Sequence, residues 1–254
     1  MDKNIIIALG LIMPGIMTGI GALPIFATKN VSQKMLDGML GFAAGIMLAA
    51  TAFSLVLPSI ELGGGDFKAV MITSLGIFFG AFMIDMIDKY SPHEHLITKK
   101  REGDMSSSLK QIWLFVIAIT IHNFPEGMAT GVGFGTNNIS DGFTLALGIG
   151  IQNMPEGLAV ALSLARENYS LKFSFWVALL TGLVEPIGAL LGYGLVKVFA
   201  PILPFVLALA GGAMLFVISD EIIPETHANG FERVSTYGII IGFIVMMVLD
   251  VLLG

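Results

Sequence analysis

The sequence contains no cysteine, so it can form no disulfide bond and offers no thiolate ligand to a metal ion. It is also poor in charge, because only 13% of its 254 residues are Asp, Glu, Lys or Arg, whereas 55% are hydrophobic. The mean hydropathy of +0.86 lies far above that of a water-soluble domain. These shortages exclude a disulfide scaffold, give no support to nucleic-acid binding, and predict a protein whose solvent is the lipid bilayer.

Apolar stretches of about 20 residues, long enough to cross a hydrocarbon core of roughly 30 Å, recur along the whole chain. A spanning segment must satisfy its own backbone groups in lipid, and no stretch shows the period-two alternation of a barrel strand, so each is predicted to be a helix. The first stretch is too long, and too interrupted by Pro14 and Pro24, for a cleaved signal peptide, and we expect it to remain in the protein. The sequence therefore predicts an all-α integral membrane fold, a single polytopic domain over residues 1–254, with eight transmembrane helices at about 4–26, 35–57, 67–87, 112–134, 142–165, 173–199, 201–219 and 234–253.

The basic residues favour one orientation of these segments. If both termini lie outside the cell membrane, ten of the thirteen Lys and Arg residues fall in cytoplasmic loops, as the positive-inside rule requires. We therefore expect a multi-pass protein of the plasma or inner membrane with both termini extracytoplasmic. The longest loop, about residues 89–110, is then cytoplasmic and carries His93 and His95 beside a basic cluster. It is either a solvated tether at the lipid headgroups or a loop that collects metal ions.

One short motif occurs twice, thirty residues apart, in the fourth and fifth segments. Because these segments are consecutive and joined by a short loop, their helices must be antiparallel, and the two copies face each other in opposite directions. At 100° per residue, the polar side chains of each copy fall on one stripe of its helix. The proline in each copy cannot donate a backbone hydrogen bond, so we expect both helices to kink beside the stripe. The copies are His122-Asn123-Phe124-Pro125-Glu126-Gly127 and Gln152-Asn153-Met154-Pro155-Glu156-Gly157.

Three carboxylates are predicted to lie inside the membrane. With a rise of 1.5 Å per residue, Glu126 lies about 24 Å beyond Lys110 and Glu156 about 15 Å before Arg166. Glu185 falls near the middle of the sixth segment. Three unpaired acids at such depths would cost on the order of 8–10 kcal/mol, and no segment has a basic residue near its centre. Protons, a bound cation or both must therefore neutralise them.

Imidazole, carboxylates and amide oxygens together form a ligand set that suits Zn²⁺ and its first-row neighbours, whereas Cu(I) prefers sulfur. The simpler alternative for one proline-linked glutamate is a protonated carboxyl that is hydrogen-bonded at a helix interface. The duplicated motif, the third acid at Glu185 and the membrane-embedded His122 favour the metal site over this alternative.

At these residues the sequence resembles the ZIP (Zrt-, Irt-like protein) family of divalent metal transporters, and specifically its bacterial GufA-like branch, through the motifs HNxPEG and QNxPEG. The resemblance implies a 3+2+3 inverted-repeat arrangement around a central antiparallel helix pair, a homodimer, and a transport site between the fourth and fifth helices. Zn²⁺ is the expected substrate, and Cd²⁺, Fe²⁺, Mn²⁺ and Co²⁺ would also fit. The resemblance assigns one ion to His122, Glu126, Gln152 and Glu156, and a second ion to Asn123, Asn153 and Glu185 with bridging from Glu126 and Glu156.

Two of these positions differ from the family pattern. Many relatives carry His where this chain has Gln152, and some carry Asp where it has Asn153. An amide offers a neutral oxygen where a carboxylate would add charge, so our hypothesis is that the second position binds an ion more weakly.

Acidic residues near helix ends are candidates for an exit to the cytoplasm, although the pattern fits solvated acids at the membrane surface equally well. Ser54, Pro58 and Glu61 mark a candidate entrance on the other side. The exit and loop candidates are Asp88, His93, His95, Asp220 and Glu221.

The sequence therefore predicts a transporter, not an enzyme, that imports a zinc-like divalent cation through a binuclear site in the membrane interior. It has no phosphate-binding Gly-x-x-x-x-Gly-Lys-Ser/Thr motif, so the ion gradient, with or without proton exchange, must drive the movement. A proton or sodium pathway and a metal-dependent intramembrane hydrolase remain as alternatives. The His-x-x-x-Glu spacing argues against the hydrolase, because zinc proteases use His-Glu-x-x-His.

Overall fold

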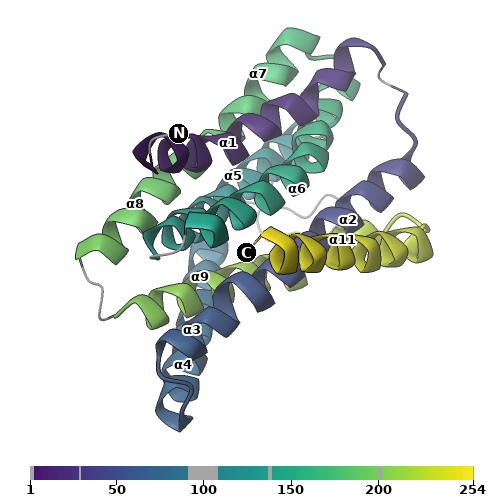
Figure 1. Cartoon of the computed structure of the whole chain (residues 1–254). Coiled ribbons are helices and arrows are strands. Elements are labelled where there is room, and N and C mark those ends of the chain that lie inside the picture. Colours follow the sequence, from purple (N-terminus) through teal and green to yellow (C-terminus); the bar gives the residue numbers. More distant parts are fainter. Residues whose placement is uncertain (1–2, 29, 91–107, 137–138, 199–201, 254) are drawn as a thin grey trace.

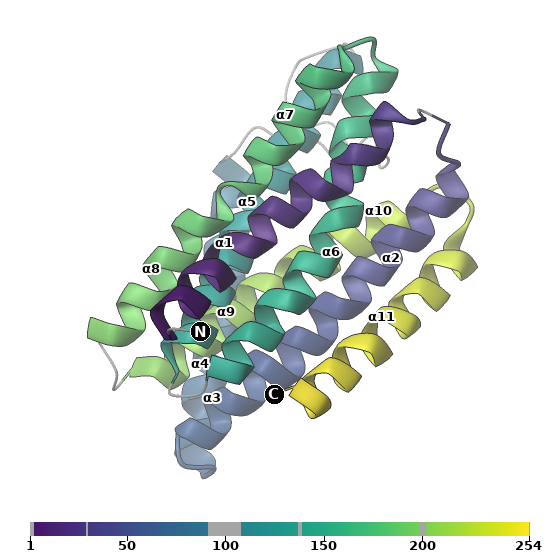
Figure 2. The ribbon, with the colours of Figure 1, turned by 45° about the horizontal axis from the view of Figure 1, so that its top comes forward.

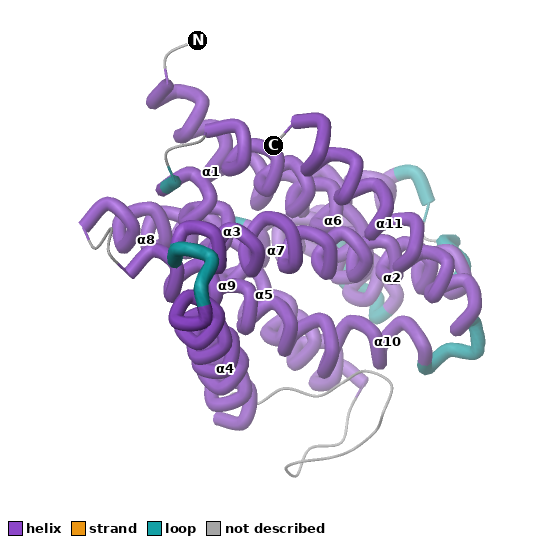
Figure 3. The backbone as a smooth tube through the Cα atoms, turned by 60° about the horizontal axis from the view of Figure 1, so that its bottom comes forward, coloured by secondary structure: helices purple, strands orange, loops and turns teal. Residues whose placement is uncertain are grey.

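The computed structural model describes residues 3–28, 30–90, 108–136, 139–198 and 202–253, and the regular structure within these ranges is entirely helical (Figure 1). Figure 3 shows how short the connecting loops are between most of the helices. The elements are α1 (Lys3–Ala22), η1 (Leu23–Phe26), α2 (Gln33–Ala50), η2 (Thr51–Val56), α3 (Leu57–Leu62), α4 (Phe67–Tyr90), α5 (Ser108–Gly135), α6 (Ile139–Arg166), α7 (Leu171–Gly182), α8 (Glu185–Val198), α9 (Leu203–Val217), η4 (Ile218–Ile222), α10 (Ile223–His227) and α11 (Glu232–Leu253).

Within the described ranges, the helices form eight rods that follow the eight predicted segments. Four rods combine several elements: α1 with η1, α2 with η2 and α3, α7 with α8, and α9 with η4 and α10. Seven rods are long and apolar enough to cross a membrane, judged by the length and composition of the described residues. The other rod, α5, is 28 residues long and packs against α6, α8 and α9. The predicted all-α membrane fold is therefore confirmed.

The sixth rod contains a break that the sequence analysis did not predict. Pro186 has no N–H to donate to the carbonyl of Gly182, and its ring would collide with that carbonyl in a continuous helix. The chain therefore leaves α7 at Gly182, turns through Leu183 and Val184, and starts α8 at Glu185. This turn places the Glu185 carboxylate at a helix start in the protein interior.

The closest packing joins the helices in four pairs: α1 with α6, α5 with α8, α2 with α11, and α4 with α9. In a 3+2+3 inverted repeat, the first three rods correspond to the last three, and α5 corresponds to α6. The pair of α1 and α6 then corresponds to that of α8 and α5, and the pair of α2 and α11 to that of α9 and α4. The packing has the correspondence expected of an inverted repeat, and Figure 2 shows α6 lying between α1 and α2, with α11 beyond α2.

The final glycine of each motif copy lies at a helix crossing. A Cβ atom at Gly127 on α5 would overlap the backbone of Glu185, and a Cβ atom at Gly157 on α6 would overlap the backbone of Thr18 on α1. Glycine at both positions lets the helix backbones approach this closely. The two crossings hold α8 against α5 and α1 against α6, one residue after each motif glutamate.

Large apolar side chains are exposed on the outside of the rods, whereas several polar side chains are buried inside. Ile46 and Met47 of α2 and Leu207 and Met214 of α9 belong to one buried apolar core. This distribution is what a lipid solvent favours, because hydrocarbon solvates apolar side chains and polar groups must find partners within the protein. The exposed apolar residues include Ile5, Leu9, Ile12 and Ile16 on α1, Phe78 and Phe82 on α4, and Ile240, Ile241 and Ile244 on α11.

Candidate metal site between α5, α6 and α8

The seven candidate ligands are all buried, and none is more than 3% exposed. Both motif helices continue through Pro125 and Pro155 without interruption, and the bends expected at these prolines stay predictions. Three helices supply the ligands: α5 carries His122, Asn123 and Glu126, α6 carries Gln152, Asn153 and Glu156, and α8 begins with Glu185.

Short hydrogen bonds join the carboxylates of the site to its amides. Gln152 Nε2 on α6 donates to Glu126 Oε1 on α5 over 2.6 Å. Asn153 Nδ2 donates to Glu185 Oε1 on α8 over 2.6 Å and to the Pro14 carbonyl on α1 over 3.1 Å. The structure therefore brings together candidate ligands from all three helices, with α1 completing the enclosure.

The site has a surplus of hydrogen-bond acceptors. Each of its three glutamates and three amides keeps one buried oxygen for which no described residue provides a donor. Burying an acceptor without a donor costs about 1–3 kcal/mol, and more for a charged group. A group of oxygens that lacks donors is the environment that a hard or borderline cation requires. The oxygens are Asn123 Oδ1, Glu126 Oε2, Gln152 Oε1, Asn153 Oδ1, Glu156 Oε1 and Glu185 Oε2.

The three carboxylates are close enough for their charges to act on one another. The charges of Glu156 and Glu185 act on Glu126, and that of Glu156 also acts on Glu185. Glu156 also lies within electrostatic range of the His122 imidazole. No Lys or Arg in the described part of the chain forms an ion pair with these acids. Repulsion inside a low-dielectric site therefore favours a guest that carries positive charge.

The ligands are gathered but are not arranged as a finished coordination sphere. Among the described residues, no three His, Asp or Glu side chains meet closely enough to hold a metal ion. The amides of Gln152 and Asn153 occupy one oxygen each of Glu126 and Glu185 instead. The second oxygen of each of these two carboxylates has no donor among the described residues and is left for a cation.

The imidazole of His122 links the site to a second group of acids. Its Nε2 atom lies 2.5 Å from Glu221 Oε1 on η4, and both side chains are buried. Glu225 follows one turn later on α10, and the charges of Glu221 and of Asp37 on α2 act on it. The acids thus continue from the site towards the end of the seventh rod.

Asp37 is a residue that the sequence analysis missed. Its Oδ1 atom accepts hydrogen bonds from Gln33 Nε2 over 2.7 Å and from Asn229 Nδ2 over 3.1 Å, while Oδ2 is buried with no donor among the described residues. Glu225 was also not named as a candidate, although the sequence marked it, because Pro224-Glu225 repeats the Pro-Glu pair of both motif copies. Asp37 carried only the weaker signal of a lone acid inside an apolar segment.

The remaining exit candidates are only partly visible. Glu221 points to His122, whereas Asp220 is exposed, as is Asp85 at the end of α4. The side chain of Asp88 and the whole of His93 and His95 lie outside the part of the chain that the structure describes.

The candidate entrance contains one further acid that the sequence analysis did not name. Ser54 Oγ on η2 donates to Asp250 Oδ1 on α11 over 2.8 Å. The charge of Asp250 also acts on Asp141 in the first turn of α6. Glu61 is exposed near the end of α3, and Pro58 lies in the first turn of the same short helix. The structure thus joins Ser54 to an acidic pair at the opposite end of the rods from Asp37.

Comparison with known proteins identifies the family. Residues 90–250 match the family described as ZIP zinc transporter. The chain is 44% identical to zinc transporter ZIPB of Bordetella bronchiseptica, over 93% of this chain and 78% of that protein. It is 42% identical to zinc transporter GufA of Myxococcus xanthus, over 96% and 97% of the two chains. It is 34% identical to human zinc transporter ZIP11, over 94% of each. With a family match over more than half of its residues and relatives that align over nearly all of it, the chain belongs to the ZIP family.

Proposed function

We propose that this protein transports Zn²⁺, or a divalent cation with similar ligand preferences, through the site between α5, α6 and α8 and into the cytoplasm. The observation that carries the proposal is the group of six buried oxygens, one from each of three glutamates and three amides, for which the described residues provide no donor. A divalent cation supplies the charge and the coordination that these oxygens lack. Relatives named zinc transporters support zinc as the cargo.

We assign the ligands as two adjoining positions. His122, Glu126, Gln152 and Glu156 form the first, which combines an imidazole nitrogen with two carboxylates and suits zinc. The second is weaker, because its amides add no charge. It comprises Asn123, Asn153 and Glu185, with Glu126 and Glu156 bridging both positions.

We place the protein in the cell membrane as a homodimer of eight-span subunits. In each subunit α5 spans the membrane together with the seven other rods, and both termini lie outside. The distribution of the basic residues supports this orientation, because it puts ten of the thirteen on the cytoplasmic side. An ion then enters beside Ser54 and Asp250 and passes through the midplane ligands. It leaves along Glu221, Glu225 and Asp37, with Asp220, Asp88 and the histidines of the 89–110 loop nearer the cytoplasm.

Uptake of zinc into vesicles that contain the purified protein tests the assignment. Glu126→Gln and Glu156→Gln keep the shape of the side chains but remove a charge and a ligand oxygen, so each should lower uptake by about tenfold or more. Glu232→Gln changes an exposed glutamate at the start of α11 and is the matched control. Uptake that is unchanged in both site variants would contradict the proposal.

Diffraction from crystals that contain zinc or cadmium tests the two positions directly. We expect a strong anomalous peak between His122, Glu126 and Glu156, and a weaker peak beside Glu185. Anomalous peaks found only elsewhere in the molecule would refute the assignment, whatever the uptake result.

A further inference from the structure

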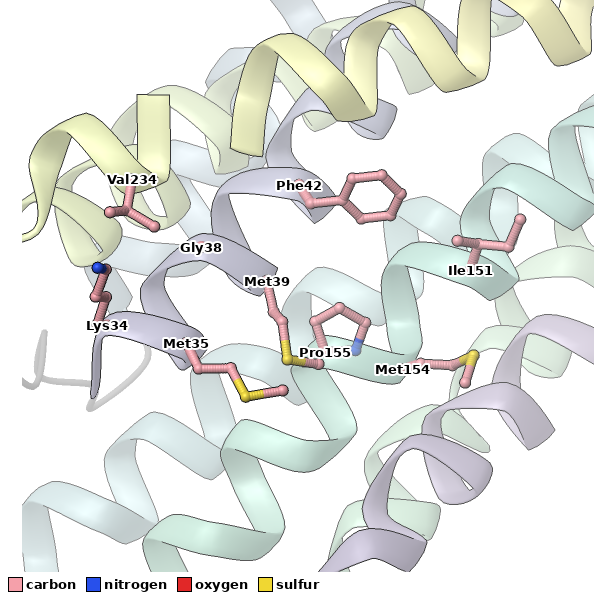
Figure 4. A pocket seen from close by; sticks show the side chains of 9 residues that line it. All are labelled: Lys34, Met35, Gly38, Met39, Phe42, Ile151, Met154, Pro155 and Val234. Carbon is pink, nitrogen blue, oxygen red and sulfur yellow. The ribbon is translucent and has the colours of Figure 1, made fainter. Parts of the chain in front are cut away.

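A groove between α2 and α6 takes no part in the proposed ion site. Its volume is about 380 Å³, and its walls are almost entirely apolar. Met35, Met39 and Phe42 line it from α2, and Ile151 and Met154 line it from α6, beside Pro155 of the second motif copy (Figure 4). Lys34 lies at one end of the groove.

The dimensions of the groove fit a straight alkyl chain. Lys34 and Phe42 are eight residues apart on α2, which corresponds to about 12 Å along the helix axis. The volume accommodates roughly a dozen groups of the size of a water molecule, at about 30 Å³ each. The methionine side chains are flexible and polarizable, so they can adapt to a chain that lies against them. The groove is thus elongated along α2 and apolar, with a charged group at one end.

The groove opens towards the membrane. Two helices flank it, α1 beyond α6 and α11 beyond α2 (Figure 2). Both helices carry exposed apolar residues. Met35 itself is 57% exposed. If no lipid chain filled the groove in a bilayer, the atoms that line it would lack dispersion partners. An acyl chain is therefore the natural occupant.

The polar end of the groove selects the headgroup. Lys34 is exposed and forms no ion pair with any described residue. It lies in the first turn of α2, whose start is marked by the hydrogen bond from Met35 N–H to Ser32 Oγ. The positive end of the helix dipole adds to the charge of the ammonium group at this point. Both features favour a headgroup with a net negative charge over a zwitterionic or neutral one.

We propose that the groove binds one acyl chain of an anionic phospholipid, with Lys34 holding its phosphate. Under the orientation proposed above, this lipid belongs to the cytoplasmic leaflet. The bound chain lies against Pro155, on the side of α6 that faces α2. The lipid therefore contacts the helix that carries Glu156.

Native mass spectrometry of the purified full-length protein tests this proposal. Equal amounts of phosphatidylglycerol and phosphatidylcholine are added, and the lipids that stay bound are counted. We expect the unmodified protein to retain one phosphatidylglycerol in preference, and Lys34→Gln to lower that retention by about fivefold. Met39→Trp, which fills the groove, should remove the bound lipid. Lys68→Gln, at an exposed lysine near the start of α4, is the matched control and should change nothing.

Equal retention of the two lipids by the unmodified protein, or full retention by Lys34→Gln, would overturn the proposal. The Lys34 variant alters an exposed side chain, so the test does not depend on the folding of Met39→Trp. Lipid retention is measured without zinc, and failure of the ion site in the uptake assay would leave this result unaffected.

Discussion

Asn153 makes two hydrogen bonds from one amide nitrogen, to the Glu185 carboxylate on α8 and to the Pro14 carbonyl on α1. A single side chain of α6 therefore connects three helices around the site. Only its oxygen, which has no donor among the described residues, is left for a cation. This arrangement gives a physical basis to the hypothesis of a weaker second position, because a neutral oxygen contributes no charge.

Asn153→Asp should therefore make folding depend on metal. The carboxylate cannot donate to Glu185 or to Pro14, and it adds a negative charge beside Glu185. Without zinc, we expect the free energy of unfolding to fall by about 1–3 kcal/mol. With zinc, the new ligand should raise the melting temperature more than in the unmodified protein. Thermal unfolding in detergent, with and without zinc, measures both effects. A variant as stable as the parent in the absence of zinc would show that the amide donor is not needed.

His122 and Glu221 should behave as a coupled pair. Their 2.5 Å contact is buried, so removing either partner leaves the other without compensation. In a double-mutant cycle with His122→Gln and Glu221→Gln, we expect the effects on unfolding free energy to differ from additivity by about 0.5–3 kcal/mol. The same cycle with Glu232→Gln, on the exposed start of α11, should be additive. Additive behaviour of the His122 and Glu221 variants would argue that the contact contributes nothing.

At the scale of elements, hydropathy predicted where the rods lie but not how they are interrupted. The seventh rod runs on to His227, past the predicted end at 219, because the acids and proline after Ser219 lower the local hydropathy without ending the helix. Two rods also contain a π-helical turn, η2 before Pro58 and η4 before Pro224. Such turns are common at functional sites, and these two occupy corresponding rods of the inverted repeat. No local periodicity predicts them.

The glycine crossings give a prediction for these elements. Gly157→Ala places a methyl group in the backbone of Thr18 and should push α1 away from α6, at a cost of about 1–3 kcal/mol in unfolding free energy. Gly194→Ala on α8 is the matched control, because a Cβ atom there meets no other atom within 4 Å. That control should be neutral or slightly stabilising, since alanine favours the helix over glycine.

Melting temperatures of the two purified variants, measured side by side, decide the question. If Gly157→Ala proved as stable as Gly194→Ala, the close approach of α1 and α6 would not be required for folding.

At the scale of the whole molecule, the helical membrane fold was predictable because a bilayer imposes its thickness on the sequence. The gathering of the motif residues was predictable because the duplicated motif marks two facing helices. The contacts that assemble the site were not. Asn153 reaches a carbonyl 139 residues away, and Glu221 reaches an imidazole on another rod. Such pairs depend on how the rods pack, which a local pattern of polar residues does not encode.

The orientation of the whole molecule is testable with unusual clarity, because the chain has no cysteine and any introduced thiol is unique. Lys68 near the start of α4 and Arg233 in the first turn of α11 are both exposed and lie on opposite sides of the proposed topology. A membrane-impermeant maleimide applied to intact cells should label Lys68→Cys at once and Arg233→Cys only after the membrane is opened. If Arg233→Cys were labelled in intact cells and Lys68→Cys only after opening, both termini would lie inside. The proposed direction of transport would then be reversed.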